Sequence, residues 1–296
     1  MSVDVRPARE DESKAMHELL TEHALASFGE PELDEDEVRS WFRLPNIWIQ
    51  VAERDGRLVG YLDVDWEKSG HFGVDARTLD AEVAPLLVAA AEEYARSKAE
   101  HPILRGFAQG DEPVLREAYA KADWRPIRHS FLMRIDLDGE LPEPVWPEGL
   151  RVRNLCAGEE ERVYEANMDS FADHWDFRPR PFEEWRRYAV ESHRFDPSLW
   201  WLVEDDDELA AVAMNSWHSS GDPRFGWVHV LGVRRPWRQR GIGTALLLHT
   251  FRGFRDRGAK RVGLGVDGEN TTGAVRLYEK AGMRVVRRTD IYEKTL

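Results

Sequence analysis

Residues 238–243, Arg-Gln-Arg-Gly-Ile-Gly, combine basic side chains with two glycines where the chain changes its periodicity. The apolar run 227–233 before them predicts a strand, and residues 244–251 after them predict a helix. Glycine lets the backbone adopt positive φ and approach a ligand closely. The first N–H groups of a helix lack internal partners, and the helix dipole favours anions there. The stretch therefore predicts a turn that binds a diphosphate.

The glycine spacing excludes two common nucleotide loops, because neither Gly-x-x-x-x-Gly-Lys-Ser/Thr nor Gly-x-Gly-x-x-Gly after a strand is present. It resembles the acyl-CoA loop of the GNAT superfamily of N-acetyltransferases, Arg/Gln-x-x-Gly-x-Gly/Ala, with Arg238, Gly241 and Gly243 at the defining positions. Taken alone, such a loop can also be a simple turn. Residues 266–270 (Val-Asp-x-x-Asn) and 277–283 (Leu-Tyr-Glu-Lys-Ala-Gly-Met) follow in the GNAT order and strengthen the resemblance.

The resemblance covers residues 150–296 and implies an α/β fold with a mixed sheet. It is similar to the tandem arrangement of the mycothiol synthase family, in which a catalytic GNAT domain accompanies a degenerate one. The expected strands of this half are 200–204, 209–216, 227–233, 262–266, 283–288 and 290–293, and the expected helices run from the glycines to about 257 and over 273–281.

The chain repeats itself, which indicates a domain duplication. One offset aligns Gly73-Val74 with Gly232-Val233 and residues 119–122 with 278–281. A segment with three prolines, 139–149, separates the copies and predicts a linker of limited flexibility. We therefore expect a first domain over 1–138 and a catalytic domain over 150–296.

The first copy has lost the glycine loop. At the matching positions it carries Leu79-Asp80-Ala81-Glu82-Val83-Ala84, and the carboxylates of Asp80 and Glu82 would repel a phosphate. We expect this copy to be degenerate, to lack diphosphate binding, and to serve a structural role, such as packing against the second domain or walling an acceptor cleft.

Composition limits the classes of function. The 296 residues are 42% hydrophobic and 32% charged with a net charge of −14, which argues against a nucleic-acid-binding surface and is compatible with a cationic acceptor. The single cysteine, Cys156, excludes an intrachain disulfide and indicates a reducing compartment. The start lacks a signal-like apolar core, and no apolar run approaches the roughly 18 residues that cross a bilayer. We expect a cytoplasmic protein with no membrane partner.

The resemblance implies how the acetyl-CoA co-substrate is held. Backbone amides of Leu231 and Val233, on either side of Gly232, would bind the thioester carbonyl and stabilise the oxyanion. The loop amides would hold the diphosphate; these belong to Arg238, Gln239, Arg240, Gly241, Ile242, Gly243 and Thr244. The side chains of Arg238 and Arg240 can add charge-assisted contacts or can be solvated surface charge. Asn270 would bond the pantetheine arm, and it equally suits an Asx turn or a helix N-cap.

Two residues are candidates for moving protons. Tyr278 can donate a proton to the leaving thiolate, although Tyr119 at the matched position of the first copy indicates a partly structural role. Many relatives place a glutamate near the position of Trp227. His229, two residues along, should face the same side and can act as the base. It can also be a packed strand histidine, and a backbone-bound water can replace it; Glu204 opens an acidic turn and suits the role less.

The second copy carries an insertion, which in the family covers the acceptor. Asp173, His174, Trp175 and Asp176 lie in it and could hold an amine-bearing cation. Alternatively Phe171, Trp175 and Trp185 simply bury a pair of helices. No metal-ligand spacing and no Gly-x-Ser-x-Gly elbow is present.

These features together predict an acetyl-CoA-dependent N-acetyltransferase that transfers acetyl to a primary amine of a small molecule by direct attack in a ternary complex. A mycothiol-type thiol precursor is one possible acceptor, against which the missing strand glutamate counts. An acyl-CoA-binding sensor without turnover and a purely structural repeat protein are the alternatives.

Overall fold

A computed structural model describes residues 2–66, 70–175, 177–270 and 272–296. The chain forms two compact units. The first comprises Met1–Ser130, Ser219–Gly221 and Arg287–Leu296, and the second comprises Phe131–His218 and Asp222–Val286. The expected linker 139–149 thus lies within the second unit, and the last ten residues of the chain belong to the first.

The first unit is built on the strand order β1-β2-β3-β4-β5-β12. Only β4 and β5 pair in parallel there, and β12 pairs antiparallel with β5 from Thr289 to Thr295. Its elements are β1 (Asp4–Pro7), α1 (Ser13–Phe28), α2 (Glu35–Ser40), β2 (Ile47–Arg54), β3 (Arg57–Trp66), β4 (His71–Arg77), α3 (Ala84–Lys98), β5 (Ile103–Gln109) and α4 (Pro113–Lys121), with 3₁₀ turns at Glu10–Glu12 and Trp41–Arg43.

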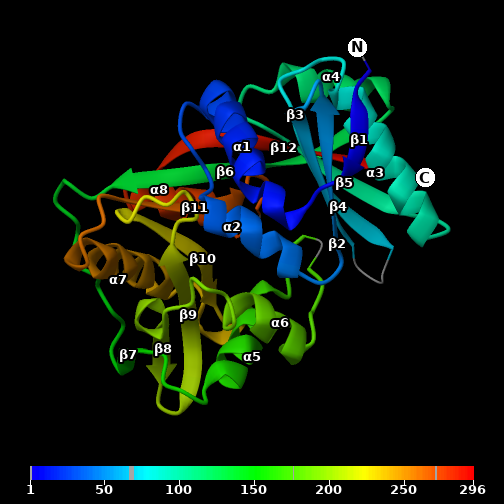
Figure 1. Ribbon diagram of the computed structural model, residues 1–296. Coiled ribbons are helices and arrows are strands. Elements are labelled where there is room, and N and C mark those ends of the chain that lie inside the picture. The colour runs from blue at the N-terminus through cyan, green and yellow to red at the C-terminus, as the bar shows by residue number, and fades with distance from the viewer. Residues whose placement is uncertain (1, 67–69, 176, 271) are drawn as a thin grey trace. The chain divides into compact units, whose positions relative to one another are not determined.

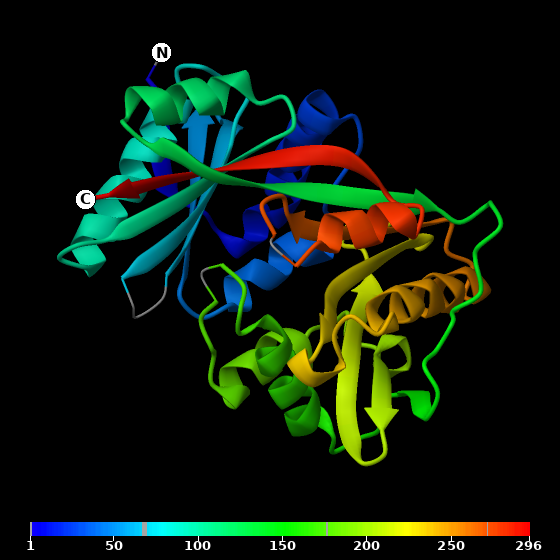
Figure 2. The same ribbon diagram turned by 180° about the vertical axis from the view of Figure 1, so that it is seen from behind.

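The second unit is built on the strand order β6-β11-β10-β9-β8-β7. Its elements are β7 (Leu150–Asn154), α5 (Glu160–Phe171), α6 (Phe182–Ala189), β8 (Trp201–Asp205), β9 (Glu208–Trp217), β10 (Phe225–Val233), α7 (Ile242–Asp256), β11 (Arg261–Asp267) and α8 (Ala274–Lys280), with 3₁₀ turns at Pro197–Leu199 and Arg235–Trp237. Two long strands, β6 (Arg125–Asp136) and β12 (Arg284–Thr295), give residues to both units. The two expected strands at 283–288 and 290–293 are therefore one continuous strand (Figure 2).

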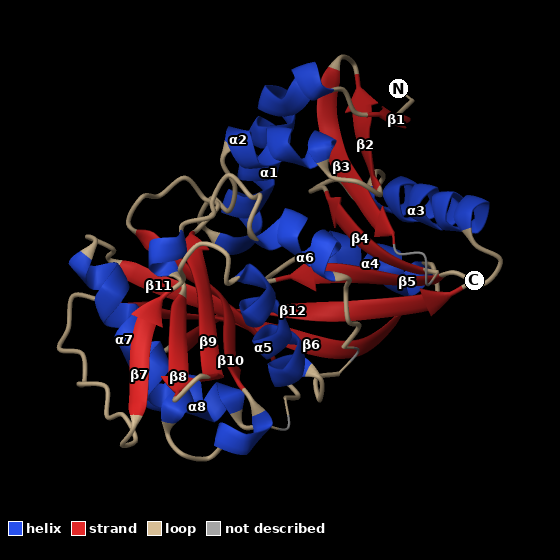
Figure 3. Cartoon of the chain, turned by 90° about the horizontal axis from the view of Figure 1, so that it is seen from below, coloured by secondary structure: helices blue, strands red, loops and turns tan. Residues whose placement is uncertain are grey.

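Helices cover both faces of the sheet in each unit. Since successive strand residues point to opposite faces, neighbouring buried residues pack with different helices. In the first unit, Val51 and Tyr61 pack with α1, whereas Ala52 and Leu62 pack with α3 (Figure 1). In the second unit, Leu202, Val212 and Met214 pack with α5 and α6, and their neighbours Val203, Ala211 and Ala213 pack with α7 (Figure 3). The predicted α/β fold with mixed sheets is confirmed. No helix among the described residues is long and apolar enough to cross a bilayer.

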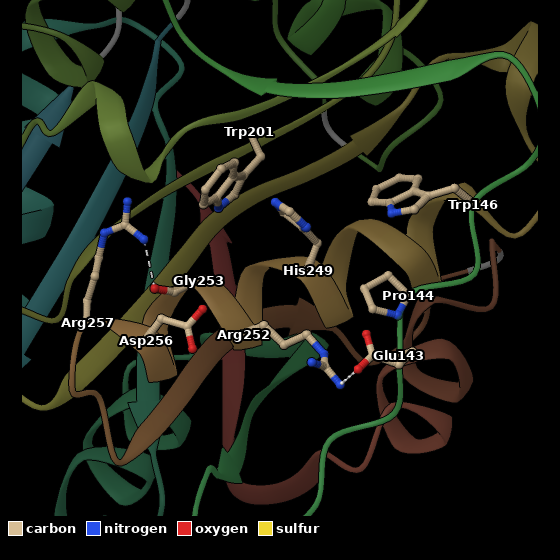
Figure 4. A pocket seen from close by; sticks show the side chains of 9 residues that line it. All are labelled: Glu143, Pro144, Trp146, Trp201, His249, Arg252, Gly253, Asp256 and Arg257. Atoms are coloured by element: carbon tan, nitrogen blue, oxygen red, sulfur yellow. Dashed lines mark hydrogen bonds and ion pairs between the residues drawn. The ribbon is translucent and has the colours of Figure 1, made fainter.

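The linker is fastened to the outer side of α7. Arg252 donates to the carbonyl oxygens of Leu141 (2.7 Å) and Pro142 (3.3 Å) and pairs with Glu143 at 2.7 Å. The rings of Trp146 and Trp201 both meet His249 edge-on, with centroid distances of 6.0 and 4.5 Å. A pocket of about 420 Å³ lies among these side chains (Figure 4). These contacts give α7 a second support besides the sheet.

Trp175 and Trp185 differ in burial, so the alternative in which these side chains bury a pair of helices holds for Trp185 only. Trp185 is 7% exposed and packs against Trp200, whereas Trp175 is 43% exposed. Replacing Trp185 by Ala should lower the free energy of unfolding by about 3–5 kcal/mol, because it empties a packed site. Trp175→Ala, the matched control, should stay within about 0.5 kcal/mol of the parent protein. Urea unfolding of both variants measures this, and equal losses would contradict it.

Candidate active site

Strand β10 separates from β11 halfway along its length. Within the described residues the two strands pair from Phe225 to Val228, where Val228 faces Leu264. β10 continues to Val233 beside β9, with a bulge between Val228 and Val230. On β11, Gly265 is exposed, and no atom lies within 4 Å of where its Cβ would be. A gap that solvent reaches therefore opens between the two strands.

Two backbone N–H groups of β10 face this gap. The N–H of Arg234 donates to Ala210 on the other side at 3.0 Å, which makes these residues a hydrogen-bonded pair of the ladder. In an antiparallel ladder such pairs alternate with pairs whose N–H and C=O groups point outward. The N–H groups of Leu231 and Val233 accordingly point away from β9. The gap is lined by two donors on one strand, the arrangement that an oxyanion requires.

Gly232 allows close packing of a helix on β10. A Cβ at this position would lie 2.8 Å from Cβ and 3.0 Å from Oγ of Ser170 on α5. Since such distances are shorter than van der Waals contact, any larger residue would push α5 from the strand. Gly232 therefore has a packing role between the two outward-facing amides.

The turn after β10 presents uncapped amides at the start of α7. Gln239 and Gly241 have φ of 62° and 83°, and α7 begins at Ile242 without a side-chain cap at Gly241. The N–H groups of Ile242, Gly243 and Thr244 form the first turn of this 15-residue helix. Because they lack partners within the helix and stand at its positive end, the turn suits a phosphate.

The side chain of Arg238 holds this turn in place. Its guanidinium donates to the carbonyl oxygens of Val233 (3.1 Å) and Ser170 (3.0 Å) and to Asp173 (2.9 Å). It thereby joins the end of β10 to the end of α5. Arg240 is exposed and approaches Asp205 only at 3.5 Å. Arg238 therefore has a structural role that neither alternative described, and Arg240 lies at the surface, while contacts of either side chain with a diphosphate stay a prediction.

Two of the expected acceptor residues, Asp173 and His174, lie beside this turn. Asp173 contacts Arg235 as well as Arg238, and both guanidinium groups lower its pKa. Burial and the charge of Arg238 lower the pKa of His174, whose ring lies 4.4 Å from that of Phe171. Asp173 thus anchors the turn, and its negative charge is already paired with the two arginines. Asp176 lies outside the described residues.

His229 lies at the bulge of β10 and keeps contact with solvent. The protein atoms packed around the ring and the charge of Arg194 lower its pKa to about 4. Nε2 lies 2.8 Å from Oγ of Ser216, the residue directly opposite Trp227. His229 and Trp227 therefore reach the same face, and the imidazole is neutral near pH 7.

Tyr278 lies on α8, and Asn270 lies in the segment before that helix. Burial raises the pKa of Tyr278, which is 9% exposed, to about 12, so its hydroxyl stays protonated and can donate. Neighbouring Leu277 is 3.2 Å from where a Cβ of Gly243 would be, which brings α8 against the start of α7. Asn270 Oδ1 accepts from the N–H of Thr272 at 2.7 Å and so forms an Asx turn.

Glu204 is committed elsewhere. It is 5% exposed and receives hydrogen bonds from Arg153 (2.6 Å) and Arg151 (3.3 Å). A carboxylate held in this way stabilises β7 against β8 and does not suit the base role. Among the described residues no group of three or more His, Cys, Asp or Glu side chains could hold a metal ion.

The first unit closes the equivalent positions with its own side chains. Asp80 accepts from the N–H of Glu82 at 2.8 Å, and Arg54 pairs with both carboxylates. β4 outruns its pairing with β5, which ends at Gly106, as β10 does with β11. There, however, the hydroxyl of Tyr119 occupies the space that a Cβ of Gly106 would need, whereas Gly265 is uncovered.

Sequence reasoning missed Ser216, Arg194 and Gly265. Ser216 is recognisable only once the register places it opposite Trp227, and Arg194 comes from a loop without a motif. Gly265 carried a signal that could have been used, since glycine inside a strand often marks a close approach of a ligand or another backbone.

Arg238→Ala should weaken binding of coenzyme A about tenfold, because it removes charge-assisted hydrogen bonds that fix the turn. The loss should persist at high salt, since it reflects geometry. Arg240→Ala should have a smaller effect that salt abolishes. Titration calorimetry at two ionic strengths measures both, and unchanged binding by Arg238→Ala would exclude its fixing role.

His229 should titrate near pH 4 and not near the ordinary 6.5, because protein atoms and Arg194 disfavour its charged form. Its ring proton resonances, identified by their loss in His229→Gln, can be followed by NMR from pH 3.5 to 8. A midpoint at 6 or above would contradict the lowered pKa of His229.

Comparisons with known proteins agree with this geometry. Residues 160–283 match the family model described as Acetyltransferase (GNAT) family. The chain is 35% identical to a mycothiol acetyltransferase of Thermobispora bispora over 60% of this chain, a match that spans 61% of the relative's length. It is 33% identical to a mycothiol acetyltransferase of Beutenbergia cavernae over 80% of each chain.

A solved structure gives the same result over nearly the whole length. The GCN5-related N-acetyltransferase of Sphaerobacter thermophilus matches with a TM-score of 0.83 and 29% identity, covering 99% of this chain and 95% of that one. The chain therefore belongs to the GNAT acetyltransferase family and is an acyltransferase.

Proposed function

We propose that the second unit transfers acetyl from acetyl-CoA to the primary amine of a small molecule, by direct attack in a ternary complex. The observation that carries this proposal is the gap between β10 and β11, which faces the N–H groups of Leu231 and Val233 and adjoins the uncapped start of α7. The two N–H groups of β10 fit the carbonyl oxygen of a thioester, and the uncapped start of α7 fits a diphosphate.

The residues of the second unit fit the different parts of acetyl-CoA. Amides from Arg238 to Thr244 would hold the diphosphate, and the exposed backbone at Gly265 leaves room for the pantetheine arm. The amides of Leu231 and Val233 would bind the carbonyl oxygen. Asn270 uses its side-chain oxygen within the Asx turn, so only its amide nitrogen would face a ligand.

Two side chains of the chain would move the protons. When bound, acetyl-CoA supplies an acetyl group activated as a thioester. His229, neutral at physiological pH, would accept a proton from the amine as the nitrogen bonds to carbon. Tyr278, whose pKa burial raises to about 12, would supply the proton that the leaving sulfur needs.

The acceptor is proposed to be a small amine. Relatives named mycothiol acetyltransferase support a small-molecule acceptor, and a mycothiol-type precursor is the first compound to test. The net charge of −14 favours cationic acceptors over acidic ones. The first unit is proposed not to bind a diphosphate, because Asp80 and Glu82 occupy the start of α3 with negative charge.

Thiol release from acetyl-CoA across a panel of amines tests the proposal. Release that depends on one class of small amine supports it. Binding of acetyl-CoA without release for any amine would identify a sensor, and the absence of binding would exclude both functions.

Tyr278→Phe should lower kcat by about 10²–10⁴ with little change in acetyl-CoA binding, because the leaving sulfur loses its proton donor. Tyr119→Phe is the matched control at the corresponding position of the first unit and should keep kcat. Steady-state thiol release measures both variants. Full turnover by Tyr278→Phe would remove the tyrosine from the chemistry.

A further inference from the structure

The hydroxyl group of Ser216 makes two close contacts but can donate its single proton to only one of them. Its Oγ lies 2.9 Å from the carbonyl oxygen of Trp217 and 2.8 Å from Nε2 of His229. A carbonyl oxygen only accepts, so the hydroxyl proton is used toward Trp217. The contact with His229 must then use a lone pair of the hydroxyl oxygen, which makes Nε2 the donor.

The ring of His229 carries one proton at neutral pH. Its pKa of about 4 follows from burial and from Arg194, a charged group that acts on the ring, while Ser216 and Trp227 beside it are neutral. A neutral imidazole is protonated on one nitrogen only. If Nε2 holds that proton, Nδ1 is left with a free lone pair.

The opposite tautomer is disfavoured by the same two contacts. With the proton on Nδ1, the hydroxyl would have to turn its only proton toward Nε2. Oγ would then face the carbonyl oxygen of Trp217 at 2.9 Å with no proton between two acceptors. Because Ser216 is 6% exposed, water has little access to relieve this contact.

We propose that Ser216 is a positioning residue, which holds His229 in the Nε2–H tautomer and leaves Nδ1 to accept the proton of the attacking amine. The inference rests on the proposed function. As the amine nitrogen bonds to the acetyl carbon and the carbon–sulfur bond breaks, one N–H proton passes to Nδ1 and the sulfur takes the proton of Tyr278. Solvent then carries the proton from His229 back to the phenolate, so both residues return to their starting states.

Nitrogen NMR of the ¹⁵N-histidine-labelled full-length protein tests the tautomer directly, with His229→Gln identifying the signals. We expect a protonated Nε2 and a bare Nδ1 at pH 7. Ser216→Ala should make the Nδ1–H form detectable and lower kcat roughly tenfold with KM nearly unchanged, because the ring loses its orientation. Ser216→Thr, which keeps the hydroxyl, should restore both the tautomer and kcat.

Several results would overturn the inference. A protonated Nδ1 in the parent protein would do so without any kinetic measurement, as would an unchanged tautomer and kcat in Ser216→Ala. If Ser216→Ala does not fold, the spectra of the parent and of Ser216→Thr still decide. Failure of the proposed function is distinguishable, because the parent would then release no thiol with any amine whatever its tautomer.

Discussion

The open site of the second unit depends on the β10–β11 ladder, which ends before β10 does. β10 follows β9 to its end but follows β11 only as far as Val228, so the backbone of its last residues is turned toward open space. Unpaired peptide groups inside a sheet are costly unless something satisfies them. Under the proposed function, the carbonyl and phosphates of acetyl-CoA would satisfy these groups, and the cost would contribute to binding. Arg238 holds the end of β10 and the end of α5 together where β11 no longer pairs with β10.

The first unit has the same interrupted ladder and the opposite outcome. Arg77, at the end of β4, is 8% exposed and is gripped by both carboxylate oxygens of Asp75 at 2.5 and 2.9 Å. Tyr119 fills the space over Gly106, and Asp80 accepts from an N–H before the start of α3, so side chains of the first unit occupy positions that are open in the second. The duplicated framework has therefore been retained while the space within it has been filled.

Much of this could be predicted from the sequence, because strand, turn and helix signals are local. The loop 238–243 and the helix after it follow from glycine spacing and periodicity, and the mixed fold follows from the family resemblance that these motifs carry. What could not be predicted depends on register and on contacts between distant segments. Asp173 meets Arg238 only after folding, Trp175 stands exposed although its type suits a core, and His229 finds Ser216 through a bulge with no sequence signature.

The last residues of β12 belong to the first unit, and this has a consequence for biosynthesis. Its residues from Arg287 onward complete the sheet of the first unit beside β5. Domains of most multidomain proteins fold in turn as the ribosome releases them. Here the half that is translated first has to wait, with β5 unpaired along one side, until β12 has been translated. The N-terminal half is therefore the part most exposed to mispairing and to chaperone capture in the cell.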